Sequence, residues 1–87
     1  MTIQELNSRL TNQLRVYIKA KGFVDSGKLL NSIQFNSTFI DNELNIKFDA
    51  MEYIKYLDNG NLLPKFLATN EPIQAIQEFY STNLTII

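Results

Sequence analysis

The chain has 87 residues, which suits one small core, and we expect residues 1–87 to form a single domain. Nine acidic and eight basic residues leave a formal charge of −1, which argues against a basic surface for nucleic acid or an anionic membrane. Cysteine and histidine are absent, which excludes disulfides and thiolate metal sites and removes the commonest catalytic bases, so we expect no enzymatic activity, metal or cofactor.

The first predicted element is an amphipathic helix from about residue 2 to residue 21. Thr2 and Glu5 fit a capping box at its start, and Gly22 stands where a glycine often ends a helix. The stripe predicts core packing or, alternatively, the docking face of a partner helix. Its members recur at spacings of three and four: Ile3, Leu6, Leu10, Leu14, Tyr17 and Ile18.

A change of direction is predicted next. Asp25, Ser26 and Gly27 are residues that favour turns. Either of the first two can cap a single helical turn that carries Leu29 and Leu30. We expect both leucines to point inward.

From Ser32 the pattern changes to period two, which indicates β-strands. Asp41 and Asn42 form a turn pair, so we expect a two-stranded antiparallel hairpin with one apolar face. Two strands are marginal in water, and the first helix, the Tyr53 helix or another subunit should cover this face. The residues expected to be buried are Ile33, Phe35, Leu44, Ile46 and Phe48.

A short helix with an apolar face is expected around residues 53–59. Tyr53, Tyr56 and Leu57 stand at i, i+3 and i+4, which places them on one face. Gly60 then ends the helix, because glycine adopts a left-handed conformation without steric cost. We expect this face to pack on the first helix or on the hairpin and to serve structure rather than catalysis.

Residues 61–67 are predicted to form an extended connector, because the residue before Pro64 is steered away from helical geometry. Such a connector would expose a run of apolar side chains that needs a cover. These side chains are Leu62, Leu63, Phe66 and Leu67.

A final helix is predicted from a cap at Asn70 to about Thr82, with Glu71 and Pro72 in its first turn. Its apolar residues at helical spacing are Ile73, Ile76, Phe79 and Tyr80. The following segment, Leu84–Ile87, is uncharged and has strand propensity, so we expect it to pair with a sheet edge or to promote aggregation. The predicted class is therefore α+β: a long N-terminal helix, an antiparallel hairpin, a short central helix, a C-terminal helix and a candidate C-terminal strand.

No stretch of the chain is apolar over the roughly 20 residues that a membrane-spanning helix needs. Gln4 and Glu5 stand where a secretory signal would carry positive charge. We therefore expect a protein made in the cytosol and without membrane contact.

The order of parts resembles the head–tail joining or tail-completion family of tailed bacteriophages. That family tends to carry a Thr-Gly-x-Leu-x-x-Ser-Ile element, a Tyr-Ala-x-x-apolar-Glu-aromatic-Gly-Thr element and a Pro-Pro-Phe-apolar element before its final helix. Here Ser26 replaces the threonine and Asp58 the glutamate. The chain also departs from the pattern at Ile54, Asn59 and Asn61, where alanine, an aromatic residue and threonine are usual, and Lys65 separates Pro64 from Phe66. The matching stretches are Ser26-Gly27-x-Leu29-x-x-Ser32-Ile33, Tyr53-Ile54-x-Tyr56-Leu57-Asp58-Asn59-Gly60-Asn61 and Pro64-x-Phe66-Leu67.

The resemblance implies a structural virion protein that forms a homo-oligomeric ring at the neck or tail end, joins head to tail and lets DNA pass as a non-specific neighbour. Its partners would be other neck or tail proteins on the portal or tail-tube side, and it would be made in the cytoplasm of a bacterial host. A ring also explains the apolar residues of the connector and of the segment 84–87, because adjacent subunits would cover them. The candidate interface residues are Leu62, Leu63, Phe66, Leu67, Leu84, Ile86 and Ile87.

A second hypothesis stays open beside the ring. The chain would then be a small cytosolic interaction module, antitoxin-like or an adaptor, that binds one partner through its first helix and the segment 84–87. An enzyme is the third and least favoured reading.

Overall fold

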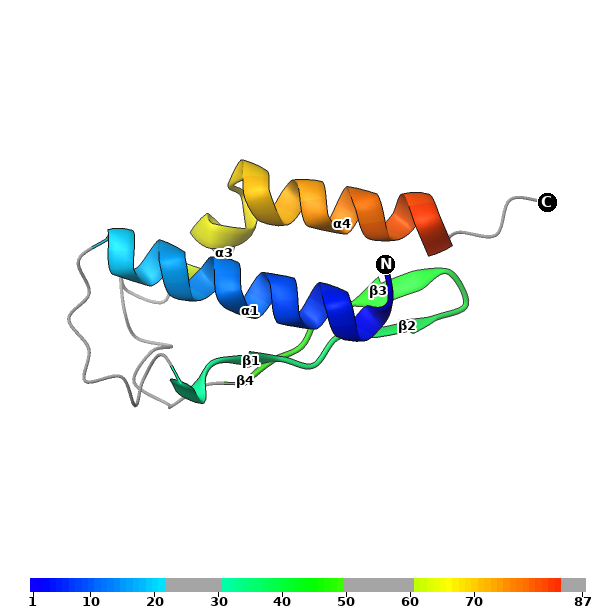
Figure 1. Cartoon of the computed structure of the whole chain (residues 1–87), viewed down its shortest axis with the longest axis horizontal. Helices are drawn as coiled ribbons and strands as arrows, with labels where there is room; N and C mark the ends of the chain where they lie inside the picture. Colours follow the sequence, from blue (N-terminus) through cyan, green and yellow to red (C-terminus); the bar gives the residue numbers. More distant parts are fainter. Residues whose placement is uncertain (22–30, 50–60, 84–87) are drawn as a thin grey trace.

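The computed structural model describes residues 1–21, 31–49 and 61–83 (Figure 1). It has the predicted α+β class, with a long N-terminal helix, short antiparallel strands and C-terminal helices. Several predictions concern residues outside the described ranges. They are the turn with Ser26, Gly27 and Leu29, the helix with Tyr53, Tyr56, Leu57 and Gly60, and the segment with Leu84, Ile86 and Ile87.

Helix α1, Ile3–Ala20, forms where the apolar spacing predicted it. The Thr2 hydroxyl accepts from the Glu5 backbone N–H at 3.1 Å, and Thr2 N–H donates to the Glu5 carboxylate, which confirms the capping box. The stripe is buried inside the chain's own core, so its core-packing interpretation is confirmed rather than the docking face. Its most buried members are Leu6, Leu10, Leu14 and Ile18.

Replacing Thr2 with alanine should lower the free energy of unfolding by about 1 kcal/mol, because the first-turn N–H groups lose their cap. Glu5→Gln should cost much less, since glutamine can also close a capping box. Urea denaturation followed by circular dichroism measures both. Equal losses for the two variants would contradict a role for the threonine hydroxyl.

The predicted hairpin is present, but its ladder is split into two short sheets. Strand β1, Gln34–Phe35, pairs with β4, Phe48–Asp49, and β2, Thr38–Ile40, pairs with β3, Glu43–Asn45. Asn36 N–H donates to the Lys47 carbonyl at 2.9 Å between the two sheets, so one register runs through the whole hairpin.

Asp41 and Asn42 make the turn, with φ angles of 54° and 61°. Positive φ at both central residues is the type I′ geometry, whose twist matches that of the flanking strands. Aspartate and asparagine tolerate this left-handed region better than other residues with a β-carbon. The turn pair predicted from sequence is therefore confirmed.

Burial on the hairpin follows the predicted alternation but differs between its two strands. Ile33 and Phe35 are each only 1% exposed, whereas Leu44, Ile46 and Phe48 are half-buried. The predicted burial is therefore confirmed for Ile33 and Phe35 and is only partial for the three residues of the return strand. The reason is position: α1 packs against β1 and hydrogen-bonds to Phe35 and Ser37, while β3 and β4 pair on the other side of β2 and β1.

The extended connector predicted for residues 61–67 is wrong, because Leu62–Leu67 form helix α3. Pro64 lies in the first turn of this helix, where backbone N–H groups have no intrahelical partner, so proline costs no hydrogen bond. Helical spacing places Leu62 and Phe66 on one face, and both are buried.

Helix α4 spans Asn70–Asn83, close to the predicted range. The first backbone hydrogen bond of this helix runs from Ile73 N–H to the Thr69 carbonyl at 3.4 Å. The capping position is therefore Thr69, whereas the sequence predicted Asn70. Ile73 is 38% exposed. The buried line is Pro72, Ala75 and Phe79.

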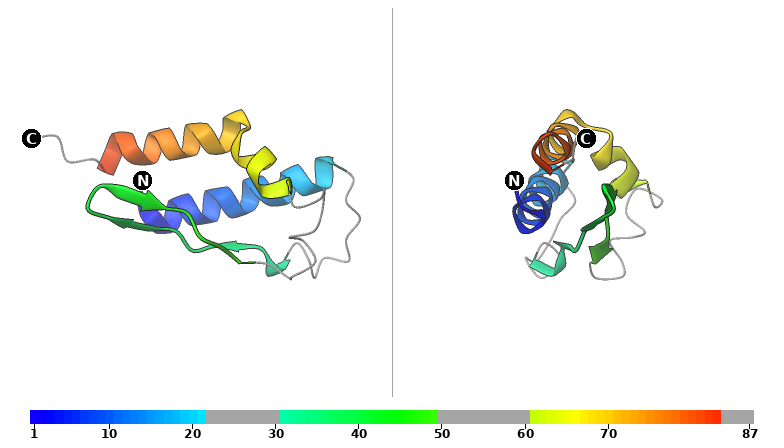
Figure 2. Two further views of the ribbon diagram at one scale, coloured as in Figure 1. Left: turned by 180° about the vertical axis from the view of Figure 1, so that it is seen from behind. Right: turned by 90° about the vertical axis from the view of Figure 1, so that its right-hand side faces the viewer.

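Helices α1 and α4 run side by side in opposite directions, and the hairpin and α3 pack against them (Figures 1 and 2). At the surface Arg9 forms an ion pair with Glu78. At one end the Asn83 side-chain amide donates to the Met1 carbonyl at 2.7 Å. One core joins all these elements, with phenylalanines from β1, α3 and α4 among its largest side chains.

Candidate functional site

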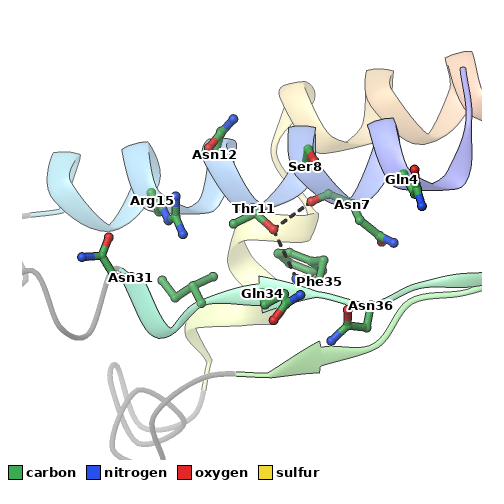
Figure 3. A pocket seen from close by; sticks show the side chains of 11 residues that line it. Gln4, Asn7, Ser8, Thr11, Asn12, Arg15, Asn31, Gln34, Phe35 and Asn36 are labelled. Carbon is green, nitrogen blue, oxygen red and sulfur yellow. Dashed lines mark hydrogen bonds between the residues drawn. The ribbon is translucent and has the colours of Figure 1, made fainter.

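An open groove of about 710 Å³ lies between α1 and β1 (Figure 3). Most of its lining side chains are neutral amides or hydroxyls, and Arg15 is the one charged side chain among them. The described residues of this lining include no carboxylate, imidazole or thiol group, and they offer hydrogen-bond donors and acceptors. The amide and hydroxyl residues are Gln4, Asn7, Ser8, Thr11, Asn12, Asn31, Gln34 and Asn36.

Two side chains of α1 form the inner wall of this groove and bind the edge of the hairpin. The Thr11 hydroxyl accepts from Phe35 N–H at 3.2 Å and donates to the Asn7 carbonyl at 2.8 Å (Figure 3). The Asn7 side chain accepts from Ser37 N–H at 2.8 Å and donates to the Ser37 carbonyl at 3.4 Å. Helix α1 thus takes the place of a neighbouring strand and closes this edge.

Sequence reasoning missed these two residues. The available signal was a pair of polar residues at i and i+4, Asn7 and Thr11, beside the apolar stripe of α1. Thr11 is buried. A buried hydroxyl needs a partner, which here is the backbone of β1.

Replacing Thr11 with valine keeps the shape but leaves Phe35 N–H without its acceptor. The free energy of unfolding should fall by about 1–3 kcal/mol, the cost of a buried unpaired donor. Asn12→Ala, an exposed change in the same groove, should change it by less than about 0.5 kcal/mol. Chemical denaturation of both variants tests this prediction. Equal stabilities would show that the Thr11 hydroxyl does not stabilise the edge of the hairpin.

The opposite edge of the hairpin is formed by β3 and β4, and we call the backbone groups that point away from β1 and β2 the outer edge. The alternation of ladder bonds places the N–H and C=O groups of Leu44, Ile46 and Phe48 on this edge. Leu44 N–H donates to the Tyr80 hydroxyl at 3.2 Å. In the described part of the chain no other partner of the outer edge is found.

The residues predicted to form a subunit interface are divided by the structure. Leu62 and Phe66 are 4% and 1% exposed and pack within their own chain, so they are not the exposed apolar surface that an extended connector would have given. Leu63 and Leu67 are half-buried beside the core. The subunit interface stays a prediction. Among the described residues, Leu63 and Leu67 are the candidates that remain partly exposed.

The family-motif residues are also divided. Ile33 is buried in the core, Ser32 is half-buried, and Pro64 is exposed in the first turn of α3. Ser32 precedes the hairpin and Pro64 belongs to α3, and the structure brings these two elements together through their phenylalanines: the rings of Phe35 and Phe66 are 6.3 Å apart.

Three further observations bear on the class of site. No group of histidine, cysteine, aspartate or glutamate side chains among the described residues could hold a metal ion. None of the described helices is both long and apolar enough to span a membrane. Comparisons with protein-family models, curated proteins and solved structures find no match for this chain.

Proposed function

We propose that this chain is a structural protein of a tailed-bacteriophage virion, a subunit of a ring at the head–tail junction or at the tail end. The ring would join head to tail and leave a passage for DNA. The motif order described above supports the phage assignment. The phage neck or tail proteins on either side of the ring are the proposed partners.

The observation that carries self-assembly is the outer edge of the hairpin. Unpaired strand edges readily accept a further strand, and natural proteins usually cover them. Half-buried apolar side chains, Leu44, Ile46 and Phe48, alternate along the same strand. An edge on one side of a subunit and a different segment on the other make a heterologous contact, which closes into a ring when the rotation per subunit allows.

The charge of the chain suits the passage of DNA. Affinity for the phosphate backbone comes mainly from lysine and arginine side chains that displace counterions. With a formal charge of −1 the chain provides no general attraction of this kind. A ring of such subunits would let DNA slide without holding it.

An amber mutation early in the gene tests the proposed function. In a host that does not suppress the mutation, electron microscopy should show filled heads and separate tails that do not join. A suppressor host should restore whole virions, and mass spectrometry of purified virions should detect the chain. Normal virions without the chain would overturn the proposal.

The amide-lined groove favours the second candidate, a small interaction module. Neutral amides can pair with the backbone of a bound peptide, and the groove lies on α1, the helix assigned to partner binding in that hypothesis. The observation that separates the candidates is genomic. Neighbouring portal, capsid and tail genes favour the ring, and a neighbouring toxin gene favours the module.

A further inference from the structure

The outer edge of β3 and β4 is built to accept one more strand. Ile46 and Phe48 present their backbone N–H and C=O groups on this edge, and no described residue pairs with them. The Tyr80 hydroxyl occupies only the first position, at Leu44 N–H. The remaining edge residues, 46–49, extend over about 13 Å at the rise of a β-strand.

The segment Leu84–Ile87 has the chemistry and length of a strand that would fit there. Its four residues carry no charged side chain, and three of them are branched at the β-carbon, a feature favoured in strands. Extended, they also span about 13 Å. Leu84 and Ile86 would share one face of the strand, because side chains alternate.

Helix α4 leads the chain toward the hairpin turn and away from the outer edge of its own hairpin. Tyr80 lies beside Leu44, and α4 runs toward the hairpin turn, opposite in direction to β3 (Figures 1 and 2). The helix ends at Asn83, which lies about 4.5 Å farther along its axis than Tyr80.

We propose that the outer edge of one copy receives the segment Leu84–Ile87 of a neighbouring copy as an added β-strand. This inference deepens the proposed ring and rests on its self-association, since it names the two surfaces that meet. Backbone hydrogen bonds at Ile46 and Phe48 would hold the segment, as in other cases of strand addition. Each copy offers one edge and one segment, so the contact is heterologous.

Two variants remove one side of the contact each. Ile46→Pro deletes an outer-edge N–H and leaves the ladder to β2 and β1 intact, because that N–H faces outward. Leu84→Asp/Ile86→Asp places charge on one face of the segment. The matched controls are Ile40→Ser, an exposed apolar residue of the same hairpin, and Gln77→Asp/Ser81→Asp, exposed on α4.

Analytical ultracentrifugation over rising protein concentration gives the first readout. Wild type and both controls should self-associate, and neither contact variant should. An equimolar mixture of the two contact variants should form a dimer that grows no further, because each supplies the half that the other lacks. A mixture that stays monomeric while wild type associates would overturn the inference.

Hydrogen exchange on wild-type protein supplies a readout that needs no variant. The amides of Ile46 and Phe48 should exchange fast in the monomer and at least tenfold more slowly in the assembly. Unchanged exchange at both amides in assembled protein, or a wild type that never associates, would overturn strand addition. The amber-mutant result would still decide the phage function by itself, so the two failures are distinguishable.

Discussion

Replacing Phe35 with alanine is expected to lower the free energy of unfolding by about 3–5 kcal/mol, the cost of emptying a phenylalanine site in a packed core. Phe35 is 1% exposed. Its ring centre lies 5.2 Å from that of Phe48 and 6.3 Å from that of Phe66, so it joins both strands of the hairpin to α3. No other single side chain links these three elements through ring contacts in the described structure.

A loss of this size matters for so small a domain. Stabilities of about 0.05–0.15 kcal/mol per residue are usual, which for 87 residues amounts to roughly 4–13 kcal/mol. The variant should therefore populate unfolded chains measurably at moderate urea. Phe48→Ala is the matched control, and it should cost only about 1–2 kcal/mol because that ring is half-buried. Equal costs would mean that the two strands are equally covered, contrary to the structure.

Replacing Phe66 with alanine should also cost about 3–5 kcal/mol, because its side chain is 1% exposed among α1, β1 and α3 residues. Its ring contacts Tyr17 at 5.6 Å as well as Phe35. An exposed connector would give a different result, since alanine at a solvent-facing position changes stability by less than about 0.5 kcal/mol. The substitution therefore separates a core role for Phe66 from an interface role.

Leu67→Ala is the control for this second prediction. Leu67 is the next residue of α3 and is half-buried, so the loss should be near 1 kcal/mol. Urea denaturation, followed by circular dichroism at a protein concentration low enough to keep the chain monomeric, measures both variants without interference from self-association. Similar small losses for the two would restore the connector interpretation. A large loss for Phe66 alone supports the helix.

The sequence determined those elements whose local signals agree with each other. A capping box at Thr2 and an apolar period of 3.6 specify α1, and the structure shows both. Period-two alternation around Asp41 and Asn42 specifies the hairpin and its register, because a slip by one residue would turn every apolar side chain to solvent.

The candidate site was less accessible to sequence reasoning. The interface prediction assumed that Leu62 and Phe66 were exposed, and this followed from the extended geometry inferred before Pro64. The apolar composition alone cannot distinguish an exposed strip from a helix face that is buried. The i, i+4 spacing of Leu62 and Phe66 indicated a helix. The prediction of an extended connector gave more weight to Pro64.

Only the tertiary structure decided between these local alternatives. Burying Leu62 and Phe66 in the shared core stabilises α3 by several kcal/mol, which exceeds the local preference of the residue before proline for extended geometry. Asn7 of α1 pairs with one edge of the hairpin through contacts 30 residues apart in sequence, so the other edge is left as the outer one. Periodicity describes each segment by itself, whereas burial and edge pairing depend on which segments meet.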